Sequence, residues 1–133
     1  NLMEEEETNW NGQAFRPYAG LLTKLATERG IDVTYARIPI RDQDVTSEET
    51  MKAILDVLDR ALGDERPVYV HCWGGRGRTG TVVGCYMARH GLAAGEGALK
   101  RIVDLRQNEP TANHPSPEND QQRAMVKMWQ EGR

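Results

Sequence analysis

The residues best suited to chemistry lie in one short stretch of this sequence, His71–Gly80. It reads His-Cys-Trp-Gly-Gly-Arg-Gly-Arg-Thr-Gly, so Cys72 is followed by five residues, an arginine and a threonine. Its glycines permit the tight turn and the close backbone approach that an anion-binding loop needs. A thiol, a guanidinium and a row of backbone amides therefore meet within a few residues, and together they suit nucleophilic attack on a phosphate ester.

Each polar group in this stretch has a distinct predicted role. Cys72 is the predicted nucleophile, because a helix N-terminus and a nearby cation favour the thiolate form of a cysteine. Arg78 offers a planar fork that binds two phosphate oxygens and neutralises their charge in the transition state. The Thr79 hydroxyl can donate to the sulfur and help it to leave when a thiophosphate intermediate is hydrolysed. The predicted phosphate-binding residues are Trp73, Gly74, Gly75, Arg76, Gly77 and Arg78.

The segments on either side of this loop must position it. Pro67–Cys72 is a short apolar run with β-branched and aromatic residues, which predicts a buried strand. Thr79–His90 has the apolar spacing of a helix and ends before Gly91. A strand, a glycine-rich turn and a helix direct several N–H groups and the positive end of the helix dipole to one spot. This junction is therefore predicted to bind an oxyanion.

The same residues carry a resemblance to a known family. His71–Thr79 match the His-Cys-x5-Arg-Ser/Thr signature, and the chain resembles the protein tyrosine phosphatase superfamily, the cysteine-based phosphatases. Trp73–Gly75 and Gly80–Cys85 are most similar to the small, dual-specificity-like bacterial members, and the likeness extends from about Asn1 to Trp129. The resemblance implies hydrolysis of phosphate monoesters through a cysteinyl-phosphate intermediate, with no metal and no organic cofactor.

A proton donor for the leaving oxygen is expected upstream, because such an acid contributes about 10²–10⁴-fold to the rate. Tyr35–Ile40 alternates well enough to be a strand, and catalytic loops collect at the carboxyl ends of parallel strands. Asp42 follows this strand, thirty residues before Cys72, and Pro39–Asp42 is similar to the acid-bearing segment of the family. Asp42 is the predicted general acid, and later the base toward water; Asp44 is the alternative.

Three residues have two interpretations each. Gln122 lies seven residues before Trp129, a spacing similar to that of a water-positioning glutamine in some family members, or it is an ordinary helix residue. Arg76 resembles a basic residue of members that act on inositol phosphates or phosphoinositides, or it is a contact for any phosphate. The acidic chain favours the second interpretation. Cys85 is expected to pack in the core, and the alternative is a regulatory partner for Cys72.

Strands and helices alternate along the chain, which predicts one domain over residues 1–133. The expected fold is α/β, with a central, mostly parallel sheet flanked by helices on both faces. Besides the helix after the loop, helices are expected over Ala14–Arg29, along the apolar stripe Met51–Leu62, around Leu99–Arg106 and over Gln122–Trp129. Asn1 and Leu2 resemble the end of a strand that begins earlier in relatives. The chain is therefore a candidate fragment that lacks one or two N-terminal strands.

The composition of the chain argues against nucleic acid and membranes as binding partners. A net charge of −3 gives no overall attraction for nucleic acid or an anionic membrane, and no apolar run reaches transmembrane length. The acidic run Glu4–Glu7 is interpreted as a solvated loop. Two cysteines, one of them assigned to catalysis, favour a reducing compartment. We therefore expect a cytoplasmic monomer that acts on a phosphorylated protein or a small phosphorylated molecule.

Three rival functions fit the motif less well. A sulfurtransferase has no need of Arg78 or Asp42, and an arsenate reductase normally has its cysteine loop at the N-terminus rather than in mid-chain. A phosphate-binding pseudophosphatase lacks reactive groups, whereas Cys72, Arg78 and Asp42 are all present. No aromatic loop clearly builds a deep cleft, which favours a shallower site with protein-tyrosine or dual-specificity-like substrates.

Overall fold

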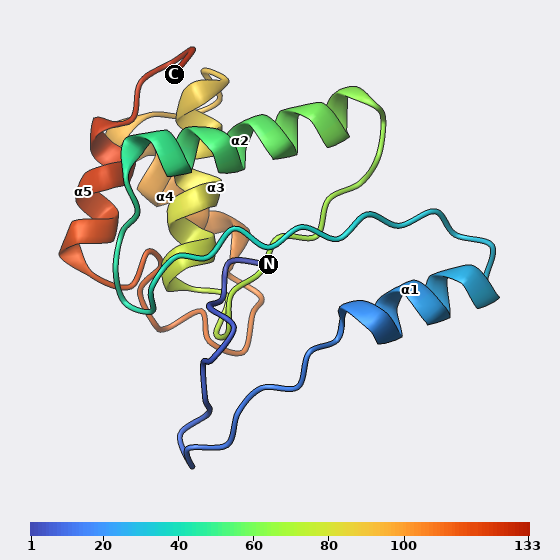
Figure 1. The fold of residues 1–133 in the computed structure, drawn as a ribbon. Helices are drawn as coiled ribbons and strands as arrows, with labels where there is room; N and C mark the ends of the chain where they lie inside the picture. Colours follow the sequence, from blue (N-terminus) through green and yellow to red (C-terminus); the bar gives the residue numbers. More distant parts are fainter.

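The computed structural model describes residues 1–133 and contains five helices and no strand (Figure 1). The helices are α1 (Ala19–Glu28), α2 (Glu48–Gly63), α3 (Gly77–Arg89), α4 (Gly95–Leu105) and α5 (Asp120–Met128). Figure 1 shows α2 to α5 packed together, whereas α1 lies apart from them. None of the five combines the length and the apolar character that crossing a membrane requires. All five predicted helices are present, with ends shifted by a few residues.

α3 is the centre of the core and carries the predicted loop at its N-terminus. Val82, Cys85 and Ala88 have no exposed surface, and the helix packs against α5, α4 and α2. At Gly84 the approach is so close that a Cβ would lie 2.6 Å from Val126 Cγ2 of α5. Glycine is therefore needed at this crossing, and the packing fixes the direction in which α3 presents its N-terminus.

α2 begins at Glu48, three residues before the predicted apolar stripe Met51–Leu62. Ser47 is its N-cap, with an extended backbone and a side-chain oxygen that accepts a hydrogen bond from Thr50 N at 3.1 Å. Its buried face carries Met51 and Leu55, neither of which has any exposed surface. The cap matters for the site because it ends the segment that carries Asp42.

The prediction of an α/β fold with a central, mostly parallel sheet flanked by helices on both faces is wrong, because the structure contains no sheet. Tyr35–Ile40 and Pro67–Cys72, the two predicted strands, are irregular, and the only β pairing is an isolated antiparallel bridge between Thr8 and Ala14. Pro67–Cys72 is also expected to be buried, but its first half is exposed: 86% of the Tyr69 surface is accessible. The helices pack on one another instead of on a sheet.

Isolated backbone hydrogen bonds take the place of a β ladder. Leu2 N donates to His71 O at 2.9 Å, and Ile40 N donates to Leu2 O at 3.0 Å, so the N-terminal residues lie between the two segments. A parallel strand needs evenly spaced bonds to a neighbour along several residues. The apolar alternation of these segments suits a strand but does not supply its partners, and without a continuous row of partners no sheet forms.

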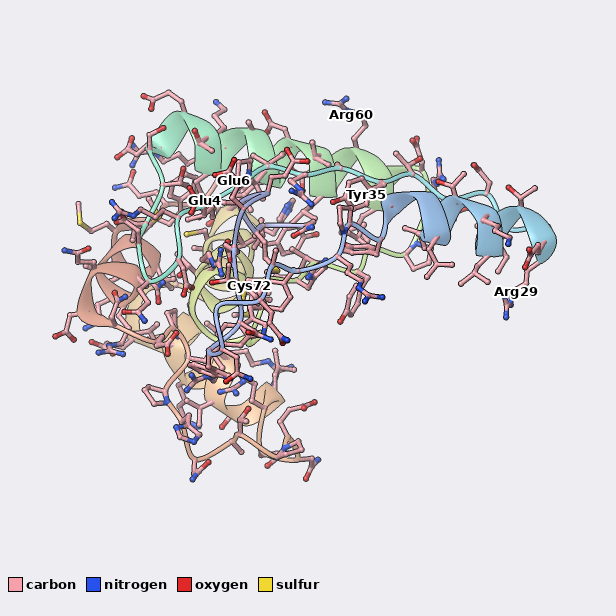
Figure 2. All side chains as sticks on the ribbon, turned by 60° about the horizontal axis from the view of Figure 1, so that its bottom comes forward. Glu4, Glu6, Arg29, Tyr35, Arg60 and Cys72 are labelled. Carbon is pink, nitrogen blue, oxygen red and sulfur yellow. The ribbon has the colours of Figure 1, made fainter.

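α1 is shorter than the predicted helix Ala14–Arg29. It begins at Ala19, after Pro17, and a proline disfavours helical backbone at the residue before it. Only Ala26 of its residues is buried. Figure 2 shows Arg29 at the outer end of this helix, away from Cys72.

Candidate active site

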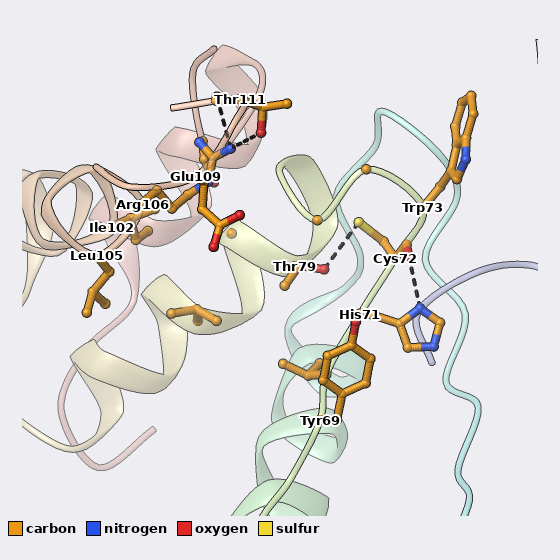
Figure 3. Close-up of a pocket in the computed structure, with 16 residues that line it drawn as sticks. Tyr69, His71, Cys72, Trp73, Thr79, Ile102, Leu105, Arg106, Glu109 and Thr111 are labelled. Carbon is orange, nitrogen blue, oxygen red and sulfur yellow. Dashed lines mark hydrogen bonds between the residues drawn. The ribbon is translucent and has the colours of Figure 1, made fainter. Parts of the chain in front are cut away.

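Cys72 lies where the chain approaches the N-terminus of α3. Only 6% of its surface is exposed, and Figure 2 shows it in the middle of the molecule. Thr79 belongs to the first turn of α3, and its Oγ1 donates a hydrogen bond to Cys72 Sγ at 3.2 Å (Figure 3). The hydroxyl is thus in the position that a donor to a departing sulfur needs.

The backbone between Cys72 and α3 forms a row of free donors. None of the N–H groups from Trp73 to Thr79 donates to an acceptor in the protein. Gly75 has a positive φ of 67°, which glycine adopts without strain, and this residue turns the loop. N–H groups at a helix N-terminus bind anions together with the helix dipole, so this backbone suits an oxyanion beside the sulfur.

Arg78 is almost completely buried and lies among carboxylates. Its side chain is 1% exposed, and Glu7 binds both arms of the fork, with Oε2 3.0 Å from Nη2. Nη2 also lies 2.9 Å from Asp42 Oδ1, and Nη1 donates to Ile40 O at 2.9 Å. Nε is buried and has no partner in the protein. The guanidinium therefore joins the loop to the N-terminal segment and to Asp42, with one donor left unused.

The charges of this cluster stabilise one another. Burial opposes the charged form of Arg78, but the hydrogen bond and charge of Glu7, with the charges of Asp42 and Cys72, raise its pKa above the usual value. Burial likewise opposes the ionised form of Glu7. Hydrogen bonds from Arg78 and from the Glu4 backbone nevertheless hold the pKa of Glu7 below its usual value. Arg78 is thus a fixed cation and Glu7 a fixed anion at neutral pH.

The structure brings Asp42 rather than Asp44 to the loop arginine. The Asp42 side chain is 49% exposed and reaches Arg78. Asp44 Oδ1 instead accepts a hydrogen bond from the N–H of Val45 at 2.8 Å. Of the two candidate acids, Asp42 is therefore the one beside the signature loop.

Two amide side chains near the start of α5 hold the backbone that follows Asp42. Asn119 Nδ2 donates to Gln43 O at 2.7 Å, and Gln122 Nε2 donates to Asp44 O at 3.2 Å. Gln122 has no exposed surface, and its Oε1 accepts from Glu118 N at 3.0 Å. The Gln122 amide is thus occupied by backbone groups and ties the acid-bearing segment to α5.

The side chains of Arg76 and Trp73 have protein partners of their own. Arg76 Nη2 lies 2.9 Å from Glu118 Oε1, and the Arg76 carbonyl accepts from Ser116 Oγ at 2.8 Å. The Trp73 ring packs against Trp10, with ring centroids 4.2 Å apart. Their backbone N–H groups, like those of the loop glycines, remain available to an anion.

His71 is hydrogen-bonded on both ring nitrogens, beside the backbone of Cys72. Its Nδ1 is hydrogen-bonded to Cys72 O at 2.9 Å (Figure 3), and its Nε2 to the Tyr18 hydroxyl. Because a carbonyl oxygen only accepts, Nδ1 carries a proton and donates to Cys72 O. Burial, followed by the effect of Tyr35, raises the pKa of Tyr18, which keeps this hydroxyl protonated. The two bonds fix the ring and the carbonyl beside it.

Two cavities meet at Cys72. The larger, of about 640 Å³, combines Cys72–Gly75 and Thr79 of the loop with an apolar wall that includes Ile102 and Leu105 (Figure 3). The smaller, of about 210 Å³, is bordered by Arg16 and Arg37 among others. The larger volume falls in the usual range for small-molecule sites, about 300–1,000 Å³. No group of His, Cys, Asp or Glu side chains is arranged to hold a metal ion.

Sequence reasoning missed three contact residues, Glu7, Tyr18 and Glu118. Glu7 belongs to the run Glu4–Glu7, in which nothing distinguishes it from its neighbours, and it binds a residue 71 positions later. Tyr18 binds a residue 53 positions later. Contacts across such separations have no local signal in the sequence, so only the path of the chain reveals them.

Comparison with known proteins gives one family and several partial relatives. The profile of the family described as "Swiss Army Knife protein, DSP-PTPase phosphatase domain" matches residues 16–128. The tyrosine-protein phosphatase cdc-14 of Caenorhabditis elegans is 43% identical over 56 residues, 41% of this chain and 8% of that protein. The dual specificity protein phosphatase CDC14B of Mus musculus is 34% identical over 67 residues, 50% of this chain and 13% of that protein.

A third relative comes from a bacterium. The effector protein hopD2 of Pseudomonas syringae pv. tomato is 37% identical over 60 residues, 45% of this chain and 12% of that protein. The chain therefore spans only a small part, 13% or less, of the length of these three curated relatives.

Proposed function

This chain belongs to the Swiss Army Knife family of DSP-PTPase phosphatase domains, and from that premise we propose that it hydrolyses phosphate monoesters through a cysteinyl-phosphate intermediate. The observation that carries the proposal is the contact of the Thr79 hydroxyl with Cys72 Sγ beside the row of free loop amides. A nucleophile, a donor for the sulfur and an anion-binding backbone are the groups that such an intermediate needs.

The first step transfers the phosphoryl group to the cysteine. Cys72 Sγ attacks the phosphorus, a sulfur–phosphorus bond forms, and the bond from phosphorus to the leaving oxygen breaks. Asp42 gives its proton to that oxygen as general acid. The loop amides from Trp73 to Arg78 bind the non-bridging oxygens, over which the charge of the transition state is spread.

In the proposed mechanism, Arg78 binds the phosphoryl group through guanidinium N–H groups that are free or easily freed in the protein. Its buried Nε has no protein acceptor, and its Nη2 is shared with the half-exposed Asp42. A phosphate oxygen that replaces Asp42 at Nη2 releases this carboxyl group toward the leaving oxygen. Glu7 and the carbonyl of Ile40 meanwhile keep the guanidinium in place. Substrate binding is thereby coupled to the freedom of the acid.

The second step returns the enzyme to its starting state. A water molecule attacks the phosphorus, Asp42 takes a proton from it, and the sulfur–phosphorus bond breaks with the thiolate as leaving group. The Thr79 hydroxyl stabilises the departing sulfur by donating to it. The expected role of Gln122 in positioning this water stays a prediction, and it requires the Gln122 amide to release Asp44 O or Glu118 N.

The proposed substrate is a phosphorylated protein, with phosphotyrosine as in tyrosine phosphatases or a broader choice as in dual-specificity enzymes. Two relatives carry these activities in their names. The larger cavity at Cys72 has an apolar wall, which suits the side chain of a phosphorylated residue. The alternatives are an inositol phosphate or phosphoinositide substrate, and phosphate binding without turnover. The single domain, the monomeric state and the cytoplasmic location expected from the sequence stay predictions.

Hydrolysis of p-nitrophenyl phosphate, combined with rapid acid quenching, tests the proposal. We expect steady turnover without added metal, and a phosphoryl group on the peptide that contains Cys72 in the quenched samples. Folded protein that binds tungstate without turnover would favour the pseudophosphatase. Turnover without any phosphorylated cysteine peptide would contradict the proposed intermediate.

A further inference from the structure

Both arginines of the loop are paired with carboxylates, and this pairing bears on the charge of the substrate. Arg78 is bound by Glu7 and Asp42, and Arg76 by Glu118. The two arginines of the loop thus lie beside three carboxyl groups. These carry three negative charges, or two when Asp42 is protonated to act as the acid. Within the loop itself, no positive charge is left over for a second phosphate group; Arg106, which lines the larger cavity and whose side chain donates only to His114 and Thr111, lies outside the loop.

The pair of Arg76 and Glu118 is built into the fold rather than lying loosely on the surface. The two side chains are only 22% and 34% exposed, and Arg76 Nη2 lies 2.9 Å from Glu118 Oε1. Ser116 is 7% exposed, and its Oγ donates to Arg76 O at 2.8 Å. The segment Ser116–Glu118 therefore holds the backbone and the guanidinium of the same arginine.

Glu118 is also fixed from the side of α5. Its N–H donates to Oε1 of the fully buried Gln122 at 3.0 Å. Arg123 Nη1 donates to Pro117 O at 2.9 Å, which fixes the residue before Glu118. A preorganised carboxylate competes well with a substrate for the same guanidinium, because little side-chain freedom is lost when it binds.

We infer that Glu118 is a specificity-determining residue that withholds Arg76 from the substrate and restricts the loop to singly phosphorylated groups. The inference rests on the proposed function and specifies its substrate class: molecules with a single phosphate group rather than molecules with several. A second phosphate group can use Arg76 only by displacing Glu118. The displacement leaves a carboxylate without its cation, next to a polyanion, and this raises the cost of binding.

The test measures binding to Cys72→Ser proteins by isothermal titration calorimetry, with inositol hexakisphosphate as the polyanion and inorganic phosphate as the single anion. Glu118→Gln keeps the shape of the side chain and removes its charge. Glu109→Gln is the matched control, because Glu109 lines the larger cavity at Cys72 and forms no ion pair with an arginine. The two variants therefore lose the same charge near the loop, and only one of them frees Arg76.

We expect Glu118→Gln to strengthen the binding of inositol hexakisphosphate at least about tenfold, the effect of one charge-assisted hydrogen bond. Phosphate binding to this variant, and both affinities of Glu109→Gln, should change by less than about threefold. The gain should disappear when Glu118→Gln is combined with Arg76→Ala. Equal gains in the two Gln variants, a gain that persists without Arg76, or no gain in folded Glu118→Gln would overturn the inference.

Circular dichroism shows whether Glu118→Gln folds. If it does not, the binding of inositol hexakisphosphate to the single variant Arg76→Ala tests the inference instead. Because Glu118 occupies Arg76, loss of this arginine should weaken the binding of inositol hexakisphosphate by less than about threefold. A loss of about tenfold or more would overturn the inference, since Arg76 would then serve the polyanion. These binding measurements do not depend on turnover. If the proposed function is wrong, the wild-type protein will not hydrolyse phosphate esters, and that result is distinct from any result of the binding measurements.

Discussion

Two carboxylates share the guanidinium of Arg78, and they differ in how easily a substrate can displace them. Glu7 is 12% exposed and binds through both of its oxygens, whereas Asp42 is 49% exposed and binds through one. A buried, bidentate pair is harder to exchange than an exposed, monodentate one. We therefore expect the substrate to displace Asp42, the group that approaches the leaving oxygen in the proposed mechanism.

Asp42→Asn should lower kcat by about 10²–10⁴-fold for an alkyl phosphate, which has a poor leaving group. The loss should be much smaller for an aryl phosphate, because a good leaving group departs without a proton. Steady-state kinetics with a series of graded leaving groups measures the difference.

Asp44→Asn is the matched control, because Asp44 bonds to the N–H of Val45 and not to Arg78. It should leave kcat nearly unchanged for every substrate of the series. If the effects of the two substitutions are exchanged, the acid is Asp44 and its assignment to Asp42 is wrong.

The two cysteines should differ in reactivity. Burial raises the pKa of Cys85 to about 12, so its thiol stays protonated at neutral pH, whereas Cys72 lines two cavities. The thiolate is the form that reacts with alkylating agents. Iodoacetamide at pH 7 should therefore modify Cys72 and spare Cys85 in the folded protein, as read by peptide mass spectrometry. Equal labelling of both before unfolding would contradict the place of Cys85 in the core.

At the scale of elements, Glu7 holds the N-terminal segment against α3. Glu7→Gln should lower the free energy of unfolding by about 1–3 kcal/mol, because it leaves the buried Arg78 with Asp42 as its only carboxylate. Glu6→Gln is the matched control, since Glu6 is exposed and forms no ion pair, and it should change stability by less than about 0.5 kcal/mol. Urea denaturation measures both values, and equal losses would rule out a specific role for Glu7.

The same pair sets a pH dependence of stability. The pKa of Glu7 in the folded protein lies below its usual value, so the pair stabilises the fold above the ordinary glutamate pKa of about 4.3. This contribution is lost as the pH falls through the lower, folded value. Acid should therefore destabilise the wild-type protein more steeply than Glu7→Gln.

The close contact of α3 and α5 depends on a glycine. Gly84→Ala should lower the free energy of unfolding by about 1–3 kcal/mol, because its Cβ would meet Val126 at 2.6 Å. Gly97 lies in α4 with open space around it, so Gly97→Ala should be neutral or stabilise the fold by up to about 1 kcal/mol. Thermal unfolding of both variants compares them, and similar effects would mean that α3 and α5 are not in close contact.

The helices could be predicted from the sequence and the sheet could not, for a physical reason. The apolar stripe Met51–Leu62 and the cap Ser47 are local signals, and a helix satisfies its hydrogen bonds within its own segment. Tyr35–Ile40 and Pro67–Cys72 have the composition of strands, but β pairing depends on partners elsewhere in the chain. Here those partners supply only isolated bonds, so local composition predicts a sheet that is absent.

At the scale of the whole molecule, the loop could be predicted and its surroundings could not. His71–Thr79 holds Cys72, the proposed nucleophile, together with the Thr79 hydroxyl that donates to its sulfur and the free backbone amides, all in one segment. The pairs of Arg78 with Glu7 and of Arg76 with Glu118 span 71 and 42 residues. Such contacts depend on the path of the entire chain, and composition therefore assigns Glu7 to solvent although it lies at the site.

Replacement of Cys72 tests cysteine-dependent hydrolysis most directly. Cys72→Ser keeps the loop amides and Arg78, so tungstate should still bind while kcat for p-nitrophenyl phosphate falls below about 10⁻⁴ of the wild-type value. Cys85→Ser makes the same change inside α3, where a serine hydroxyl can bond to a backbone carbonyl one turn back, and it should retain hydrolysis. Steady-state hydrolysis by pure, folded Cys72→Ser at a rate comparable with the wild-type protein would contradict the assignment of the nucleophile.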